Sequence, residues 1–368
     1  MQLPNANNLP IEILSQSFSE TTTSYKFYWF LAILEDLTEN NSSIISLEKL
    51  AIRMISKVWY PLDYFKLSFG KQDQFKQVSV FLSSKIKIDN SPNSENLFKQ
   101  INKQLDNKEL QSLHEIINER IKYVPYRLLR PFFKNELRGE DDHKIKNKII
   151  EFAENEFDTR KPFYCFLGNS IKIHEEWKEY FIKHNYILQS FIYWHLLKYL
   201  QKNNPNVIGL SEKLFKPKQR DLKDANKFWK NYIEIKKGVN CIYSNTLITD
   251  NYSIDHFVPW TYIAHDQLWN LLPTTKSINS SKSDNLPNFD KYFYNFTDLQ
   301  FDAFKIIFNS NLKDKKQVLE DYSIFFNSDL ENINEFTKNK FQQKLEETIK
   351  PMLQFAENMG FNSNWIYK

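Results

Sequence analysis

The stretch Ser253-Ile-Asp-His-Phe-Val-Pro-Trp260 differs in character from most of the chain, and it decides how the fold is interpreted. Two related pieces follow it, Leu268-Trp-Asn-Leu-Leu-Pro273 and Ser277-Ile-Asn-Ser-Ser-Lys-Ser-Asp284. Across residues 238–287, short β-prone pieces alternate with turn residues, and a short helix is expected over residues 275–284. The sequence therefore predicts a small α+β insert in this region.

Outside the insert, the chain has the pattern of a helical protein. Apolar residues recur at helical spacing in residues 47–58, 110–121 and 187–192, and again after residue 290. Residues 25–37 are apolar almost all round, which is typical of a helix buried in the middle of a domain. We therefore predict a mainly α fold class, with a helical N-terminal body, a small central α+β insert and a helical C-terminal region.

The predicted domains follow these changes of pattern. Residues 1–205 form a helical domain that serves recognition, partner binding or dimerisation, and it ends at the polar, helix-terminating sequence Asn203-Asn204-Pro205-Asn206. Residues 206–237 form a basic connecting segment, residues 238–290 form the insert, and residues 291–368 form the C-terminal helical region.

Glycine is scarce, with six residues among 368. They are Gly70, Gly139, Gly168, Gly209, Gly238 and Gly360. A P-loop and a dinucleotide-binding fingerprint both need several glycines within one short turn, so both are excluded. Tight β-hairpins also favour glycine, which argues against a turn-rich β-sandwich or barrel. Any phosphate chemistry must therefore proceed without a glycine-rich cradle.

The remaining composition points to an intracellular protein. Two cysteines, Cys165 and Cys241, cannot form a disulfide framework. The N-terminal sequence lacks a basic region followed by a long apolar run, so no signal peptide is evident. The most apolar stretch, residues 27–34, is far shorter than the ~20 residues needed to cross a bilayer. We expect a cytoplasmic protein that does not bind membranes.

Positive charge is concentrated just before the insert. Residues 211–237 hold nine basic and four acidic side chains, a net charge of +5, whereas the whole chain carries +4. Aromatic residues are interleaved with these cations, a mixture that suits nucleic acid. By itself the pattern fits a solvated helix face with a buried aromatic side better, and its position just before the insert is what favours nucleic acid. The candidate contacts to nucleic acid here are Lys216, Lys218 and Arg220.

The insert contains an Asp-His pair, Asp255-His256, with Val258-Pro259 just after it. Asn270 follows within Trp-Asn-Leu-Leu-Pro, and Asn279 begins Asn-Ser-Ser-Lys-Ser-Asp. Together these residues resemble the HNH endonuclease family, whose active module is a β-hairpin followed by a helix around one divalent metal ion. The resemblance covers residues 238–287, about a seventh of the chain. It implies that the central insert is a ββα-metal nuclease module.

The resemblance also assigns roles to individual residues. It makes His256 the general base, because a neutral imidazole with a pKa near ~6.5 can accept a proton from water at physiological pH. It makes Asp255 and Asn279 ligands of Mg²⁺ or Mn²⁺, hard cations that prefer oxygen donors. Asn270 would hold the loop that orients His256. Lys282, one helical turn after Asn279, is a candidate phosphate contact.

Lys276 is a further candidate contact to nucleic acid, and the alternative for Lys282 is a solvated side chain. The sequence also departs from the family pattern. Many HNH proteins carry two Cys-x-x-Cys pairs that hold a structural zinc ion. Here those positions are Cys241 with Ser244 and Thr275 with Ile278. One thiol cannot hold a tetrahedral zinc ion, so we expect no structural zinc.

The expected function is metal-dependent hydrolysis of nucleic acid, most simply of double-stranded DNA. The resemblance suggests a role in restriction or anti-phage defence, and a homodimer or a partner within a defence complex. Two alternatives stay open: a nucleic-acid-binding subunit that is inactive alone, and a nuclease directed at RNA or tRNA.

Overall fold

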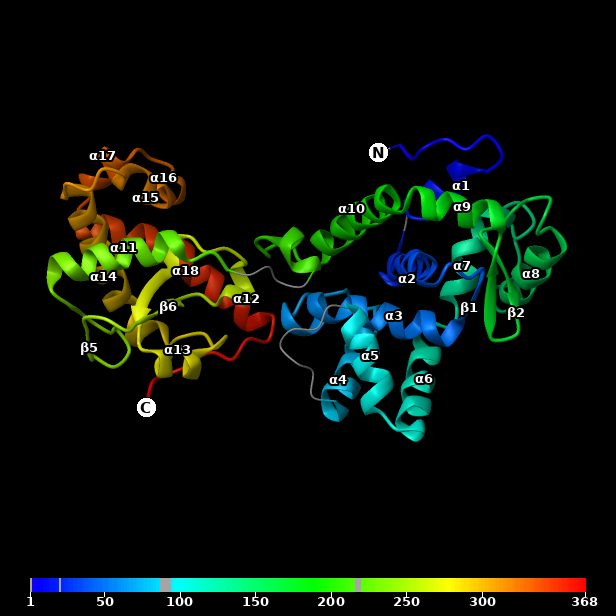
Figure 1. Ribbon diagram of the computed structural model, residues 1–368, viewed down its shortest axis with the longest axis horizontal. Coiled ribbons are helices and arrows are strands. Elements are labelled where there is room, and N and C mark those ends of the chain that lie inside the picture. Colours follow the sequence, from blue (N-terminus) through cyan, green and yellow to red (C-terminus); the bar gives the residue numbers. More distant parts are fainter. Residues whose placement is uncertain (1, 20, 87–93, 216–219) are drawn as a thin grey trace. The chain divides into compact units, whose positions relative to one another are not determined.

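The computed structural model describes residues 2–19, 21–86, 94–215 and 220–368. The chain divides into two compact units, each treated by itself below (Figure 1). Unit 1 comprises Met1–Pro205 with Lys213–Lys216, and unit 2 comprises Asn206–Glu212 with Pro217–Lys368. The elements are mostly helices with a few short strands, which confirms the predicted fold class. Among the described residues, no helix has the length and apolar character needed to span a membrane.

Unit 1 combines helices with one small sheet. Its elements are α1 (Ile11–Gln16), α2 (Tyr25–Asn40), β1 (Ile44–Ser46), α3 (Leu47–Trp59), the π-helical turn η1 (Tyr60–Tyr64), α4 (Phe75–Lys85), α5 (Ser94–Gln104), α6 (Asn107–Ile121), α7 (Val124–Leu129), the 3₁₀ turn η2 (Arg130–Phe133), α8 (Asp142–Asn155), β2 (Tyr164–Leu167), β3 (Ser170–Ile173), α9 (Glu175–Lys183) and α10 (Asn185–Asn203). The strands form an antiparallel sheet in the order β1-β3-β2. The 3₁₀ turn η3 (Leu210–Leu214) lies where the sequence ranges of the two units meet.

Helix α2 forms the centre of unit 1. Residues 27–34 are all buried, as expected for a stretch that is apolar on every side. Helices α3, α7, α9 and α10 contact α2 (Figure 1). The contact with α7 matters below, because it brings the start of α2 and the basic side of α7 to one cavity.

Unit 2 surrounds two short hairpins with helices. Its elements are α11 (Lys223–Lys236), β4 (Val239–Asn240), β5 (Leu247–Ile248), β6 (Ser253–His256), α12 (Trp260–Ile263), the 3₁₀ turn η4 (Leu268–Asn270), β7 (Leu271–Thr274), α13 (Lys276–Lys282), α14 (Phe289–Asn309), α15 (Lys315–Val318), α16 (Glu320–Phe326), α17 (Leu330–Asn334) and α18 (Lys338–Asn358). Strand β4 pairs with β5, and β6 pairs with β7, both antiparallel.

The hairpins and the helices of unit 2 share one hydrophobic core, which runs from Ala225 in α11 to Phe361 after α18. Phe257, just after β6, stacks on Phe296 of α14, with ring centroids 4.3 Å apart. Trp269 of η4 lies 4.5 Å from Phe325 of α16 by the same measure. Helices α14 and α16 therefore both pack against the connection between β6 and β7.

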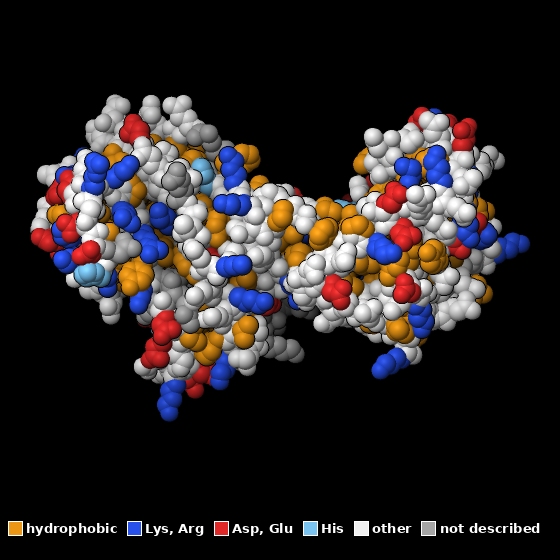
Figure 2. All heavy atoms as spheres, turned by 180° about the vertical axis from the view of Figure 1, so that it is seen from behind, with side chains coloured by type: hydrophobic (Ala, Val, Ile, Leu, Met, Phe, Trp, Pro, Cys, Tyr) orange, Lys and Arg blue, Asp and Glu red, His pale blue; other side chains and the backbone are white. Residues whose placement is uncertain are grey.

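One glycine is favoured by the backbone conformation. Gly238, between α11 and β4, has φ of +131°. Residues with a side chain rarely adopt this conformation, so the entry to the first hairpin favours glycine. The surface visible in Figure 2 carries lysine and arginine interspersed with aspartate and glutamate. The division into four domains at residues 1–205, 206–237, 238–290 and 291–368, with the roles expected for them, stays a prediction.

Candidate active site

Strands β6 and β7 and helix α13 form a ββα unit. The two strands pair in register from Ser253 opposite Thr274 to His256 opposite Leu271. Helix α13 follows β7 at once, because the Thr275 side chain accepts a hydrogen bond from the amide of Ile278 and caps the helix. Helix α13 packs against β6. The short helix expected over residues 275–284 is thus confirmed, and it lies beside the strand that carries the Asp-His pair.

Asp255 is almost completely buried, with 3 % of its surface exposed. The Tyr243 hydroxyl, from the turn between β4 and β5, donates to Oδ2 of Asp255 at 2.8 Å. The Lys282 ammonium lies 3.3 Å from Oδ1. Burial and the Asp255 charge both raise the pKa of Tyr243, so this hydroxyl stays protonated and continues to donate. The carboxylate is therefore held from two sides, each oxygen keeping a further lone pair.

His256 is the last residue of β6 and is 4 % exposed. Adjacent strand residues point to opposite faces, so the strand end is where this side chain can leave the regular alternation. Its Nε2 lies 2.8 Å from Oδ1 of Asp266. An ionised carboxylate only accepts hydrogen bonds, so with Asp266 ionised Nε2 carries the hydrogen and Nδ1 keeps its lone pair.

Burial lowers the pKa of His256 below its ordinary value. The carboxylates of Asp266 and Asp255 oppose this effect, and the positive charge of Arg220 adds to it. The net direction keeps the imidazole neutral at physiological pH. A neutral imidazole with one nitrogen fixed by a carboxylate has the arrangement of a general base.

Asn270 locks the loop that follows His256. It is completely buried, and its side chain makes two hydrogen bonds to one residue. Its Oδ1 accepts from the amide of Val258, and its Nδ2 donates to the carbonyl of Val258, both at 2.8 Å. The carbonyl of Asn270 also accepts from the amide of Phe257 at 2.8 Å. This is the placement expected of a residue that orients the loop beside His256.

Helix α13 carries Asn279 and Lys282 one turn apart, on a common face. Asn279 is half-buried, and its side chain forms no hydrogen bond with any residue in the described part of the chain. Lys282 is completely buried, and its ammonium donates to the carbonyl of His256 at 2.6 Å as well as to Asp255. A solvated Lys282, the alternative expected from the sequence, is therefore wrong, because the ammonium is completely buried. Its contact with a phosphate stays a prediction.

The other predicted contacts to nucleic acid are not gathered in the same way. Arg220 is exposed, with its guanidinium carbon 5.2 Å from the centre of the Trp260 ring, and its charge lowers the pKa of both His256 and Lys282. It is therefore close to the site. Lys276 is exposed in the first turn of α13. Lys216 and Lys218 lie outside the described residues.

Sequence reasoning missed two partners of the site, Asp266 and Tyr243. Asp266 lies in the loop before η4, ten residues after His256, and no motif marks it. Its loop is held from a distance, because the Asp321 carboxylate of α16 accepts from the amide of Leu268 at 2.8 Å. Tyr243 lies in the turn between β4 and β5, next to the positions considered only as possible zinc ligands. Its hydroxyl was the feature of the sequence that could have indicated a polar contact in this turn.

Cys241 and Thr275, two of the zinc-ligand positions of related proteins, have other contacts here. The Cys241 thiol is buried and lies 3.3 Å from the hydroxyl of Thr274. Thr275 caps α13. Among the described residues, no three or more His, Cys, Asp or Glu side chains come together in a way that could hold a metal ion.

Comparison with known proteins gives one match. Residues 240–288 match the model of a family described as HNH endonuclease. No curated protein and no solved structure matches the chain. The matched range contains β6, β7 and α13 with Asp255, His256, Asn270 and Asn279 in the order the motif requires. The chain therefore carries, in residues 240–288, a nuclease domain of the HNH endonuclease family.

Proposed function

We propose that this protein is a metal-dependent endonuclease that hydrolyses phosphodiester bonds in double-stranded DNA. The single observation that carries the proposal is the state of His256. Its Nε2 is bound to Asp266 and burial keeps it neutral, so Nδ1 can accept a proton. A residue with only a structural role in a hairpin has no need of this arrangement.

In the proposed reaction, Nδ1 of His256 removes a proton from the attacking water. The water oxygen bonds to phosphorus, the bond from phosphorus to the 3′ oxygen breaks, and the departing oxygen takes a proton from solvent water. The products carry a 5′-phosphate and a 3′-hydroxyl. Asp266 stabilises the imidazolium that forms and keeps the ring in one orientation. Asn270 preserves this geometry by fixing the backbone at Val258. The histidine therefore begins each cycle in the correct tautomer.

The side chains near His256 fit a hard divalent cation. Asp255 offers a carboxylate with lone pairs to spare, and the amide oxygen of Asn279 has no hydrogen-bond partner among the described residues. Oxygen donors of this kind suit Mg²⁺ or Mn²⁺, which retain several positions for water and phosphate. When bound, such a cation would polarise the phosphate and stabilise the leaving oxygen. Asp255 and Asn279 would hold it.

Access to the site is part of the proposal. Asp255 and His256 are 3 % and 4 % exposed, so a phosphodiester reaches them only when neighbouring chain moves aside. Arg220 is an exposed cation close to His256, and it is suited to contact the backbone of the incoming strand. Lys276, at the exposed start of α13, is a second such contact.

The biological setting rests on the family resemblance. We propose that the protein acts in the cytoplasm in restriction or anti-phage defence, as a homodimer or with a partner in a defence complex. The expectation that no structural zinc is present belongs to the same proposal, with Cys241 as a packed thiol. Phage plating on cells that express the protein or its His256→Ala variant tests the defence role.

A nicking assay tests the chemistry. Supercoiled plasmid with Mg²⁺ should be converted to open-circular or linear DNA, and EDTA should stop the reaction. His256→Ala should reduce the rate by roughly 10²–10⁴-fold, the usual contribution of a general base. Tyr186→Ala, which removes an exposed ring on α10 of unit 1, is the control and should leave the rate unchanged. A folded His256→Ala protein that cuts as fast as the parent would disprove the mechanism.

Substrate class is tested in the same buffer with duplex DNA, single-stranded DNA and RNA. Preferential cleavage of RNA would replace duplex DNA as the substrate and keep the mechanism. Binding of nucleic acid without cleavage, in Mg²⁺ and in Mn²⁺, would instead favour a binding subunit that needs a partner.

A further inference from the structure

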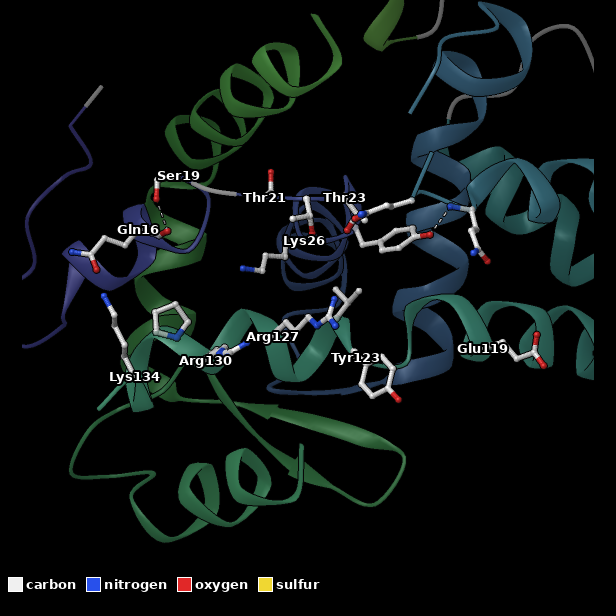
Figure 3. A pocket seen from close by; sticks show the side chains of 16 residues that line it. Gln16, Ser19, Thr21, Thr23, Lys26, Glu119, Tyr123, Arg127, Arg130 and Lys134 are labelled. Atoms are coloured by element: carbon white, nitrogen blue, oxygen red, sulfur yellow. Dashed lines mark hydrogen bonds between the residues drawn. The ribbon is translucent and has the colours of Figure 1, made fainter. Parts of the chain in front are cut away.

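Unit 1 contains a cavity of about 870 Å³ that has no part in the nuclease site. Its walls come from the segment around Thr21–Thr23, the start of α2, the turn before α4, and α7 with η2. Figure 3 shows Thr21, Thr23 and Lys26 on one side and Tyr123, Arg127 and Arg130 on the other. The two sides come from elements that pack together, since α7 contacts α2.

The side of α7 and η2 that faces the cavity is cationic because of its sequence spacing. Arg127, Arg130 and Lys134 recur at intervals of three and four residues and so share one face of the helical turns. The residues between them, Leu128, Leu129, Phe132 and Phe133, are buried in the core. Packing of these apolar residues therefore fixes three cations on the open side.

Lys26 adds a fourth positive charge from α2. It is half-buried, and its ammonium donates to the carbonyl of Ser17 at 3.4 Å. Burial lowers the pKa of Lys26, and the charges of Arg127 and Arg130 lower it further. These cations are thus close enough to disfavour one another. Nearby negative charge would relieve that repulsion.

The described lining of the cavity contains one carboxylate, that of Glu119. Lys26, Arg127 and Lys134 form no ion pair with any residue that the structure describes. Asp73 lies behind the wall, and its carboxylate accepts hydrogen bonds from Ser24 and Phe75.

The rest of the lining consists largely of neutral hydrogen-bonding groups. They are Gln16, Ser19, Thr21, Thr22, Thr23, Gln72, Gln74 and Tyr123. Few apolar side chains reach the cavity, which argues against a lipid or another greasy ligand. Its volume falls in the range of about 300–1,000 Å³ that is usual for small-molecule sites. Hydroxyl and amide groups beside four cations match the phosphates and sugar of a nucleotide.

We propose that this cavity binds the phosphate groups of a nucleotide through Lys26, Arg127, Arg130 and Lys134. The nucleotide is either free, as an effector of the protein, or part of a single strand. A smaller cavity of about 260 Å³ also has Arg127 and Arg130 in its wall, together with Lys146. A strand could continue into it, whereas a free nucleotide would need the larger cavity alone. The site does not depend on cleavage by the nuclease domain.

The test uses the full chain in EDTA, so that no cleavage occurs. The probes are ATP, measured by calorimetry, and a fluorescent 12-nucleotide DNA strand, measured by anisotropy. The double variant Arg127→Gln/Arg130→Gln should weaken binding by about a hundredfold or more, because each charge-assisted hydrogen bond to phosphate contributes about tenfold. Arg127→Lys/Arg130→Lys keeps both charges and should lose less. Arg138→Gln, an exposed arginine outside the cavity, is the matched control.

The outcomes distinguish a free nucleotide from a single nucleic-acid strand as the ligand of the cavity. ATP binding that falls in the Gln variant and not in the control supports a free nucleotide. Binding of the strand alone with the same dependence supports a strand, and its salt slope should fall by about 0.7 for each phosphate contact removed. If neither probe binds, or if the Gln variant binds both probes as the parent does, the proposal is overturned. Equal weakening by Arg138→Gln would also overturn it.

Discussion

The loop after His256 depends on one buried amide, and removing that amide provides the sharpest test of the site. Asn270→Ala removes two 2.8 Å hydrogen bonds and leaves the N–H and C=O of Val258 without partners in a buried place. An unsatisfied buried polar group costs roughly 1–3 kcal/mol. We therefore expect the free energy of unfolding of unit 2 to fall by about 2–6 kcal/mol. The nicking rate should fall as well, because Val258 lies two residues after the general base.

The stability arm of this test is guanidinium unfolding followed by tryptophan fluorescence, which reports on buried Trp229 and Trp269 in unit 2. Plasmid nicking at a temperature where the variant stays folded supplies the rate. Asn226→Ala on α11 is the matched control, since its side chain makes a single exposed hydrogen bond to the carbonyl of Leu222. Its stability should change by less than about 1 kcal/mol.

Two results would refute the reasoning. If Asn270→Ala unfolds at the same denaturant concentration and with the same slope as the parent, the two hydrogen bonds do not hold the loop. If stability falls by the expected amount but a folded Asn270→Ala protein cuts at the parental rate, the loop does not orient His256.

Three further predictions concern charged side chains. Burial raises the pKa of Asp73 to about 6, so its protonated form favours folding, and the free energy of unfolding should fall by roughly 3 kcal/mol as pH rises from about 4 to 7. Asp73→Asn should remove that slope in denaturant titrations across this range. Asp266→Ala should lower the nicking rate by roughly ten-fold or more, because the ring of His256 loses its orienting carboxylate. Lys282→Met should destabilise the protein by roughly 3–5 kcal/mol in thermal or denaturant unfolding, because it leaves buried Asp255 without its cation.

Each of these has a result that would count against it. An unchanged pH slope in Asp73→Asn would mean that the Asp73 carboxyl titrates near its ordinary value. Parental nicking by Asp266→Ala would show that the hydrogen bond to His256 has no catalytic role. A Lys282→Met protein as stable as the parent would mean that the ion pair with Asp255 is not buried in solution. Lys276→Met, on the exposed face of the same helix, is the control for that last substitution.

The main features of the nuclease domain could be predicted from the sequence because they depend on local patterns. The strand that carries Asp255-His256 and the short helix expected over residues 275–284 both follow from neighbouring residues. The spacing from His256 to Asn270 and Asn279 carried the family resemblance. The burial of α2 was equally clear, since its residues are apolar on every side.

The remaining features depend on distant packing. Asp266 meets His256 through a loop whose position is fixed by Asp321, more than fifty residues further on. Helical spacing placed Lys282 on the same face as Asn279, but it could not show that this face packs against β6 and buries the ammonium. A lysine on a short polar helix is ordinarily exposed, so the local pattern indicated a solvated side chain, whereas the Lys282 side chain is buried.

The core that the hairpins share with α11, α14 and α18 limits how this nuclease could be inherited or engineered. Residues 238–290 alone would lose the aromatic partners of Phe257 and Trp269, which lie on α14 and α16. A fusion made from that segment would expose both rings and should be insoluble. A recombination event that kept the fold would instead have to exchange everything from α11 to beyond Phe361. In this chain the HNH segment folds as part of one larger unit and not as a separable domain.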